Sequence, residues 1–171
     1  MGFLHRLYAA GTVLAAIFMV LIAALTLAQV IGRVIGVLVP DAGDLAGYAM
    51  AATIFLALAH TFRSGGHIRV NLLLTHVGPR LRHALECWCL VVLAGIGALF
   101  AGVSVKLVLD SYEFGDVSTG MMPVPLWIPQ TSMALGAILF EMAVIEELVR
   151  VFRGREPRYE QTEAAVESYS E

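Results

Sequence analysis

Residues 7–31 read LYAAGTVLAAIFMVLIAALTLAQVI, a run of about 25 residues without one charged side chain. A helix that crosses the roughly 30 Å hydrocarbon core of a bilayer needs about 20 mostly apolar residues, because each residue advances the helix by about 1.5 Å. The run is also longer than the roughly 7–15 residue core of a secretory signal, which a basic start at Arg6 would otherwise suggest. The stretch therefore predicts a membrane-spanning helix.

Three further apolar runs along the chain have the length of a membrane span. We expect these spans at residues 45–62, 86–109 and 125–149, the last of them free of charge up to Glu141. The composition agrees, since 58% of the residues are hydrophobic and 15% are charged, whereas a soluble domain has about 45–50% and 25%. The sequence predicts an all-α membrane protein with a four-helix transmembrane domain over residues 1–150.

The basic residues predict the orientation of these spans, because arginine and lysine collect in short cytoplasmic loops. Nine of the eleven fall on one side of the four spans: Arg6, Arg63, Arg69, Arg80, Arg82, Arg150, Arg153, Arg155 and Arg158. The other side, which we call outer, keeps Arg33 and Lys106 beside five acids: Asp41, Asp44, Asp110, Glu113 and Asp116. We therefore expect both termini in the cytoplasm.

The segment 67–83, between the second and third spans, is too short to cross a membrane but is amphipathic. Its apolar residues share one helical face: Val70, Leu73, Leu74, Val77 and Leu81. We expect a helix interrupted at Gly78-Pro79 in the cytoplasmic interface, and the alternative is a loop packed on the bundle. Its polar residues would lie near lipid head groups: His67, Arg69, Arg80 and Arg82. Residues 151–171 are polar and acidic, so we expect a mobile cytoplasmic tail.

The outer start of the fourth span is Pro123-Val-Pro125-Leu-Trp127. Proline is accepted in the first turn of a helix, and tryptophan prefers the membrane interface. We expect Trp127 to anchor this end at the membrane surface. Arg33, at the outer end of the first span, has three alternatives: a lipid phosphate, a partner subunit, or the acids near Asp41 and Asp44.

Two ionisable residues inside the spans, His60 and Glu141, are costly there and need a reason. His60 would serve as a haem ligand or proton relay, but no other span offers the second histidine that a haem between helices usually needs, so we favour an interface position. For Glu141, ion coupling, pairing with Arg63 and reaching toward water all stay open. Cys87 and Cys89 are too few for a disulfide framework or a zinc site.

Small residues repeat every fourth position in the third span, at Ala94, Ala98 and Gly102, which permits close approach of another helix. No glycine-rich phosphate loop, nucleophile elbow or zinc signature is present. The residues therefore support neither an enzyme nor a cofactor site in this chain, and nothing in them points to nucleic acid. Four spans are also few for a transport path, which favours a helper subunit.

Four stretches of the chain carry a family resemblance. They are Gln29-Val-Ile-Gly-Arg33, Arg63-Ser-Gly-Gly-His67-Ile-Arg69-Val-Asn71-Leu-Leu, Pro79-Arg80-Leu-Arg82-His-Ala-Leu-Glu86 and Pro123-Val-Pro125-Leu-Trp127. Together they resemble the small, DctQ-like membrane subunit of the tripartite ATP-independent periplasmic (TRAP) transporters. One departure is that the family often has a tryptophan and paired glutamates before the second span, where this chain has Asp41-Ala-Gly-Asp44.

The resemblance implies a complex in the bacterial inner membrane. A large membrane subunit would carry the substrate and sodium sites and move as an elevator, while a periplasmic binding protein delivers an organic acid. This chain would be a non-catalytic part of the static frame, in contact with lipid and without a cofactor. The outer acids would be candidates for docking the binding protein: Asp41, Asp44, Asp110, Glu113 and Asp116. Taken without the resemblance, the residues also allow a membrane anchor of an oxidoreductase or a self-sufficient small transporter.

Overall fold

The structure is a computed structural model that describes residues 2–64 and 78–153. Four helices make up most of these ranges: α1 Gly2–Ile35, α2 Ala42–Arg63, α4 Pro79–Phe114 and α5 Trp127–Phe152. The described ranges contain no β-strand beyond a single isolated bridge between Val117 and Pro125. The predicted all-α class is therefore confirmed for the part of the chain that the structure describes.

Three of the helices are long and apolar enough to cross a membrane. The qualifying segments are Arg6–Ile35 with 30 residues, Ala42–Arg63 with 22 and His83–Phe114 with 32. They contain the predicted spans at 7–31, 45–62 and 86–109. Chains with several such helices are membrane proteins, as the composition predicts.

The fourth predicted span, at 125–149, falls on α5. This helix has 26 residues, which is about 39 Å by the helical rise and longer than the hydrocarbon core. It also carries three acids and an arginine in its second half: Glu141, Glu146, Glu147 and Arg150. α5 is not among the three segments above, so the count of four spans and the cytoplasmic termini stay predictions.

The helix ends follow from glycine and proline. After α1, Gly36 adopts φ 74° and the amide of Val37 donates to the Gly32 carbonyl at 2.8 Å, which closes the helix. α4 begins with Pro79 in its first turn and ends before Gly115, whose φ is 68°. Residues 79–83 thus belong to α4, and the predicted boundary of the interfacial helix near residue 83 is wrong, because Pro79 starts the long helix. Residues 67–77 of that helix and 154–171 of the predicted tail lie outside the described residues.

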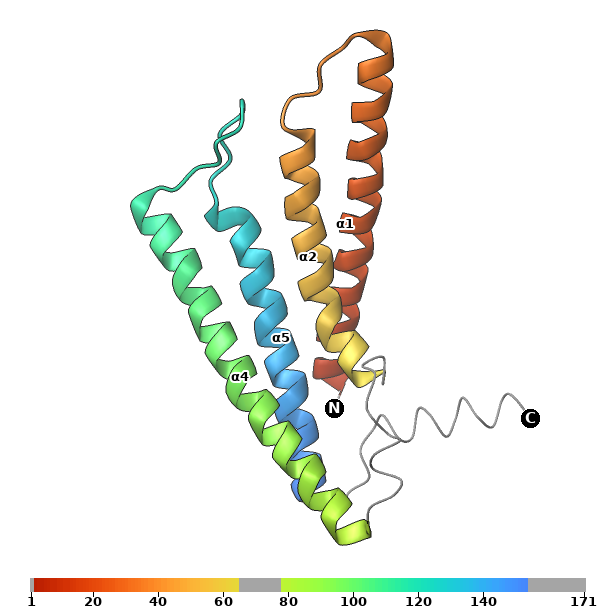
Figure 1. The fold of residues 1–171 in the computed structure, drawn as a ribbon, viewed down its shortest axis with the longest axis vertical. Coiled ribbons are helices and arrows are strands. Elements are labelled where there is room, and N and C mark those ends of the chain that lie inside the picture. The colour runs from red at the N-terminus through yellow and green to blue at the C-terminus, as the bar shows by residue number, and fades with distance from the viewer. Residues whose placement is uncertain (1, 65–77, 154–171) are drawn as a thin grey trace, which may run out of the picture.

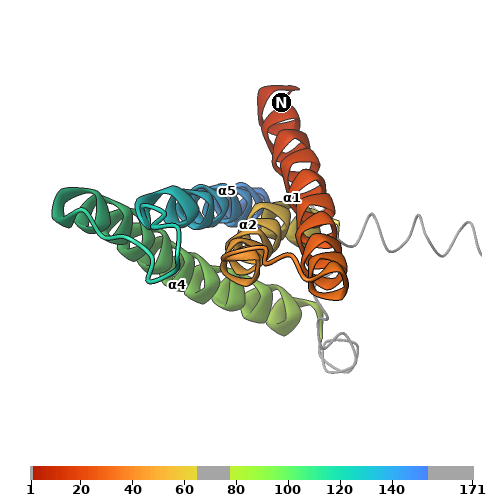
Figure 2. The same ribbon diagram turned by 90° about the horizontal axis from the view of Figure 1, so that it is seen from above.

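The four helices form two antiparallel pairs, α1 with α2 and α4 with α5, joined through a contact between α2 and α5 (Figure 1). The pairs diverge toward the end that carries the α1–α2 and α4–α5 connections, which we call the outer end of the structure. Seen from above, α2 lies between α1 and the α4/α5 pair (Figure 2). The two pairs therefore form a V, and the two outer connections lie at its wide end (Figure 1).

The core between the helices consists mainly of small residues. One cluster lies toward the inner end and contains Tyr8, Ala59, Phe62, Leu90, Ala143, Val144 and Val151. A second cluster higher in the bundle contains Ala15, Ala52 and Leu56. At Gly136 of α5, an added Cβ would overlap the backbone carbonyl of Phe55, so this glycine lets α2 and α5 approach closely. The chain holds its helices together by close backbone packing, as membrane helices do.

Candidate functional site

An inner junction, formed by Tyr8, Arg63 and Glu146, ties three helices together. Arg63 at the end of α2 lies 3.7 Å from the Glu146 carboxylate of α5. Its guanidinium carbon also lies 4.4 Å from the ring centre of Tyr8 on α1, a cation–π contact. Tyr8 is buried, while the Arg63 and Glu146 side chains keep 19% and 25% of their surface exposed. The junction holds α1, α2 and α5 together where the two pairs converge.

Glu141 lies one turn nearer the outer end of α5 and points at α4. The residue is 9% exposed, and its Oε2 atom has no hydrogen-bond partner within the described part of the chain. The side chain occupies the space left by Gly97 of α4, since a Cβ there would overlap Oε2. Arg63 pairs with Glu146 rather than with Glu141. Glu141 is thus a packed acid between α4 and α5.

At the outer end, a hairpin formed by residues 116–126 connects α4 to α5. The amide of Ser118 donates to the Val124 carbonyl at 2.9 Å, and the amide of Val124 donates to the Ser118 hydroxyl at 3.0 Å. The amide of Leu126 closes the base on the carbonyl of Asp116 at 2.9 Å. This outer hairpin therefore has its own hydrogen-bonded frame and extends beyond the helix ends.

Asp41 attaches the outer hairpin to the start of α2. Its carboxylate accepts hydrogen bonds from the amides of Met121, at 2.9 Å, and Met122. Asp41 adopts φ 54°, a left-handed conformation that aspartate tolerates better than most residues. Gly120 makes the approach feasible, because a Cβ there would lie 2.7 Å from the carboxylate. One acid thus bridges two connections about 80 residues apart in the chain.

The other predicted docking acids share the outer end without joining this contact. Asp44 is exposed in the first turn of α2, and Glu113 is exposed in the last turn of α4. Asp116 is exposed at the base of the hairpin, and Asp110 on α4 is half-buried. Among the five predicted acids, the structure gives Asp41 an internal partner and leaves Asp44, Glu113 and Asp116 facing outward.

The predicted interface residues lie at the helix ends. Trp127 opens α5 and meets the ring of Tyr112 of α4 edge-on, with 5.7 Å between ring centres. Arg33 is exposed in the last turn of α1. Arg80 and Arg82 lie in the first turns of α4, while His67 and Arg69 lie outside the described residues.

The predicted small-residue face of α4 lies one position away from the face that packs inside the chain. Gly97, Ala101 and Ser104 are buried against the bundle, whereas Ala98 and Gly102 are exposed and Ala94 is half-buried. The repeat of Ala94, Ala98 and Gly102 therefore leaves two of its three members available to something outside this chain. Sequence spacing identified a helix with small residues but not the neighbour that each face meets.

The structure also places the histidines and cysteines that were considered as metal or haem ligands. Within the part of the chain that the structure describes, histidines, cysteines and acids form no group of three or more that would hold a metal ion. His60 is exposed near the end of α2, and Cys87 lies 3.7 Å from the His83 ring on α4. The organised polar features of the described residues are therefore the inner junction and the contact of Asp41 with the outer hairpin.

Sequence reasoning missed the roles of Gly97, Gly120 and Asp41. Each depends on a contact between segments that are far apart in the chain, and a single sequence does not record which segments meet. The one available signal was Asp41-Ala-Gly-Asp44, since an aspartate before a helix start is typical of a capping position. Asp41 does precede α2, but its side chain binds the hairpin instead of the helix.

Comparison with known protein families gives a match over most of the chain. A family model described as the DctQ component of the tripartite ATP-independent periplasmic transporters matches residues 22–154, most of the chain. The matched range contains all four stretches that carried the resemblance. Neither a curated protein nor a solved structure matches the chain. The chain belongs to the DctQ component family of the tripartite ATP-independent periplasmic transporters.

Proposed function

We propose that the chain is a non-catalytic small subunit that forms part of the static frame of a TRAP transporter. A large membrane subunit in the bacterial inner membrane carries the sodium and substrate sites, and a periplasmic binding protein delivers an organic acid to the complex. The observation that carries this proposal is the family match over residues 22–154. The members of this family are transporter components, which favours a transporter subunit over the membrane anchor of an oxidoreductase.

The exposure of the helices supports a frame role. In the most apolar part of α1, 6% of the residues are buried within the chain, against 28% in α2. A helix that packs so little against its own chain needs lipid or a partner subunit along its length. α1 and the exposed face of α4 with Ala98 and Gly102 offer surface for both.

The polar contacts at the two ends support a part that does not move. The inner junction connects α1, α2 and α5, and Asp41 connects the α1–α2 connection to the outer hairpin. Such cross-links between separate segments resist relative motion of the helix pairs. A moving transport domain needs a rigid neighbour of this kind.

The proposed topology has four spans with both termini in the cytoplasm. α5 supports a fourth crossing by its length of 26 residues, since its acids lie in the inner half. The arginines of the inner end would lie near lipid head groups, and the outer end would face the periplasm. There, the exposed Asp44, Glu113 and Asp116 provide negative charge for docking the binding protein.

The experiment is affinity purification of the tagged chain from its native membrane, followed by reconstitution. We expect a large polytopic membrane protein to co-purify in a fixed ratio. Sodium-dependent uptake of an organic acid into liposomes should require that partner, this chain and the binding protein together. Uptake by this chain alone in liposomes would contradict the proposal, and so would a purified chain that never retains a large membrane partner.

A further inference from the structure

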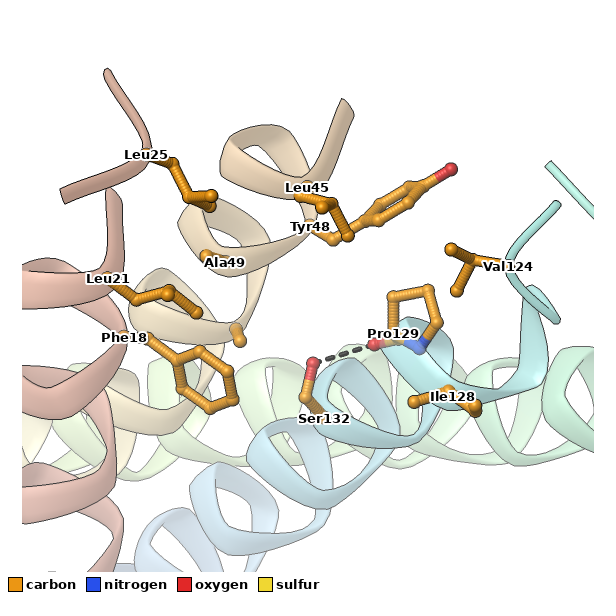
Figure 3. A pocket seen from close by; sticks show the side chains of 11 residues that line it. Phe18, Leu21, Leu25, Leu45, Tyr48, Ala49, Val124, Ile128, Pro129 and Ser132 are labelled. Carbon is orange, nitrogen blue, oxygen red and sulfur yellow. Dashed lines mark hydrogen bonds between the residues drawn. The ribbon is translucent and has the colours of Figure 1, made fainter. Parts of the chain in front are cut away.

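A cavity of about 240 Å³ lies between α1, α2 and the start of α5, in the outer half of the bundle (Figure 3). α1 contributes three of the lining residues, α2 four and the α5 region four. They are Phe18, Leu21, Leu25, Leu45, Tyr48, Ala49, Ala52, Val124, Ile128, Pro129 and Ser132. None of them is charged, so the cavity favours an uncharged occupant.

The lining contains two hydroxyl groups, those of Tyr48 and Ser132, and neither points a free hydrogen-bonding group into the cavity. The Ser132 hydroxyl already donates to the Pro129 carbonyl at 2.6 Å. Tyr48 extends its ring away from Leu21 and Leu25, with the hydroxyl at the edge of the group (Figure 3). The cavity is open on one side, and an apolar lining of this kind offers dispersion contacts to whatever covers it. The lining therefore suits a hydrocarbon group.

The cavity opens sideways at the depth of one membrane leaflet. Leu21 and Ile128 line it and yet keep 42% and 49% of their surface exposed, so its mouth lies on the side of the bundle. Ala52, its deepest residue on α2, is about 15 Å from the outer end of that helix by the helical rise. That distance is about half of the roughly 30 Å hydrocarbon core. A lipid chain in the outer leaflet reaches this depth.

Charge at the outer end of α1 fits a lipid whose chain enters here. Leu21, Leu25, Gln29 and Arg33 are spaced by four residues and form one ridge along α1. The ridge leads from the cavity wall to Arg33, about 12 Å farther out than Leu25. Arg33 is exposed and has no ion pair among the described residues. A guanidinium in this position suits a phosphate at head-group level.

We propose that the cavity holds one acyl chain of an outer-leaflet phospholipid whose phosphate is bound by Arg33. An empty apolar cavity would forfeit dispersion contacts along its whole lining, and a hydrocarbon chain restores them. The bound lipid fills the outer opening between α1 and α5, where the two helix pairs diverge. It thereby supports the outer half of the bundle, where the buried residues are mostly alanines.

The test uses the full chain in nanodiscs of phosphatidylethanolamine and phosphatidylglycerol. A trace of phosphatidylethanolamine with a diazirine midway along one acyl chain is included, and labelled residues are mapped by mass spectrometry after irradiation. We expect label to concentrate on Leu21–Leu25 and Ile128–Ser132 relative to the exposed Ile96 and Leu99 of α4. Equal labelling of all these positions would overturn the proposal.

Two matched variants test the cavity itself. Ser132→Phe places a ring in the cavity and should lose the excess label, whereas Thr131→Phe adds the same ring to the neighbouring position, which does not line the cavity, and should keep it. Both replaced hydroxyls donate only to a carbonyl of the same helix, at 2.6 Å. Unchanged label in Ser132→Phe would overturn the assignment.

Two variants of Arg33 test the phosphate site. Labelling of the complex with the large subunit tests whether a lipid still occupies the cavity there. Arg33→Gln should lose the excess label, and Arg33→Lys should retain it, because the phosphate needs a positive charge. The labelling is then repeated with the large subunit bound. Persistence of the label supports a lipid occupant, and its loss would show that a side chain of the large subunit fills the cavity instead.

Discussion

At the scale of single residues, Asp41 combines an unusual backbone with an unusual partner. Its left-handed φ of 54° turns the carboxylate away from α2 and toward the amides of Met121 and Met122. Those amides lie in a hairpin tip that has no helix to satisfy them. The contact therefore orders the outer hairpin through one side chain, and losing that side chain has a local, measurable effect.

Asp41→Ala should speed hydrogen exchange at the amides of Met121 and Met122. A hydrogen bond to a charged group contributes about 1.5–3 kcal/mol, and the lower value suits an exposed site. We therefore expect the exchange rate of each amide to rise about tenfold. Asp41→Asn keeps an oxygen acceptor and tolerance for the left-handed backbone, and should give a smaller rise. Asp44→Ala is the control, since no hydrogen bond joins Asp44 to the hairpin. Equal exchange in Asp41→Ala and the unmodified chain would show that Asp41 does not order the outer hairpin.

Gly97 offers a second test at the same scale. Gly97→Ala places a methyl group on the Oε2 atom of Glu141, and such overpacking costs about 1–3 kcal/mol of the free energy of unfolding. The measurement is unfolding in mixed detergent micelles followed by circular dichroism. Adding Glu141→Ala to Gly97→Ala should recover most of the loss, because the two changes share one contact.

The matched control is Gly102→Ala on the same helix. Nothing lies within 4 Å of a Cβ at Gly102, so alanine there should leave stability unchanged or raise it by up to about 1 kcal/mol through helix propensity. A loss at Gly102 as large as that at Gly97 would mean that glycine is needed in α4 for its backbone rather than for the room it leaves Glu141.

At the scale of helices, the contact between α2 and α5 joins the two pairs. Gly136→Ala would push a methyl group into the backbone carbonyl of Phe55, and a backbone has less freedom to yield than the Glu141 side chain has. We expect a loss of about 3 kcal/mol, more than at Gly97, in the same unfolding measurement. Gly47→Ala on α2, where a Cβ meets nothing, is the control. A smaller loss at Gly136 than at Gly97 would place the critical contact elsewhere.

The sequence predicts a helix reliably where the membrane environment alone requires one, whatever the helix packs against. The uncharged run at 7–31 requires a long helix whatever it packs against, and α1 contains it entirely. The register of α4 was not predictable, because small residues at Ala94, Ala98 and Gly102 and at Gly97, Ala101 and Ser104 look equally suited to packing. Only the position of α5 selects the second set. The Asp41 contact was unpredictable for the same reason, since it joins positions about 80 residues apart.

At the scale of the whole molecule, the two ends are held by different chemistry. The inner end has a buried cluster and the Tyr8–Arg63–Glu146 junction, whereas the outer end has one carboxylate on a hairpin and a cavity between diverging helices. The inner contacts include α5, and they require its carboxyl end to lie beside the end of α2. If α2 ends at the cytoplasmic surface, the end of α5 must lie there too.

That reasoning gives a topology experiment on the complete chain. In a background with Cys87→Ala and Cys89→Ala, single cysteines are introduced as Thr119→Cys in the outer hairpin and Arg153→Cys after α5, both exposed positions. A membrane-impermeant maleimide should label Thr119→Cys in intact spheroplasts and Arg153→Cys only after permeabilisation, because the charged reagent cannot cross the hydrocarbon core of the bilayer. Ser64→Cys, at the end of α2, is the control for a cytoplasmic position: it should stay unlabelled as long as the spheroplast membrane is intact. Labelling of Arg153→Cys in intact spheroplasts, with Ser64→Cys still protected, would mean that α5 does not cross the membrane and that the inner junction forms differently in the bilayer.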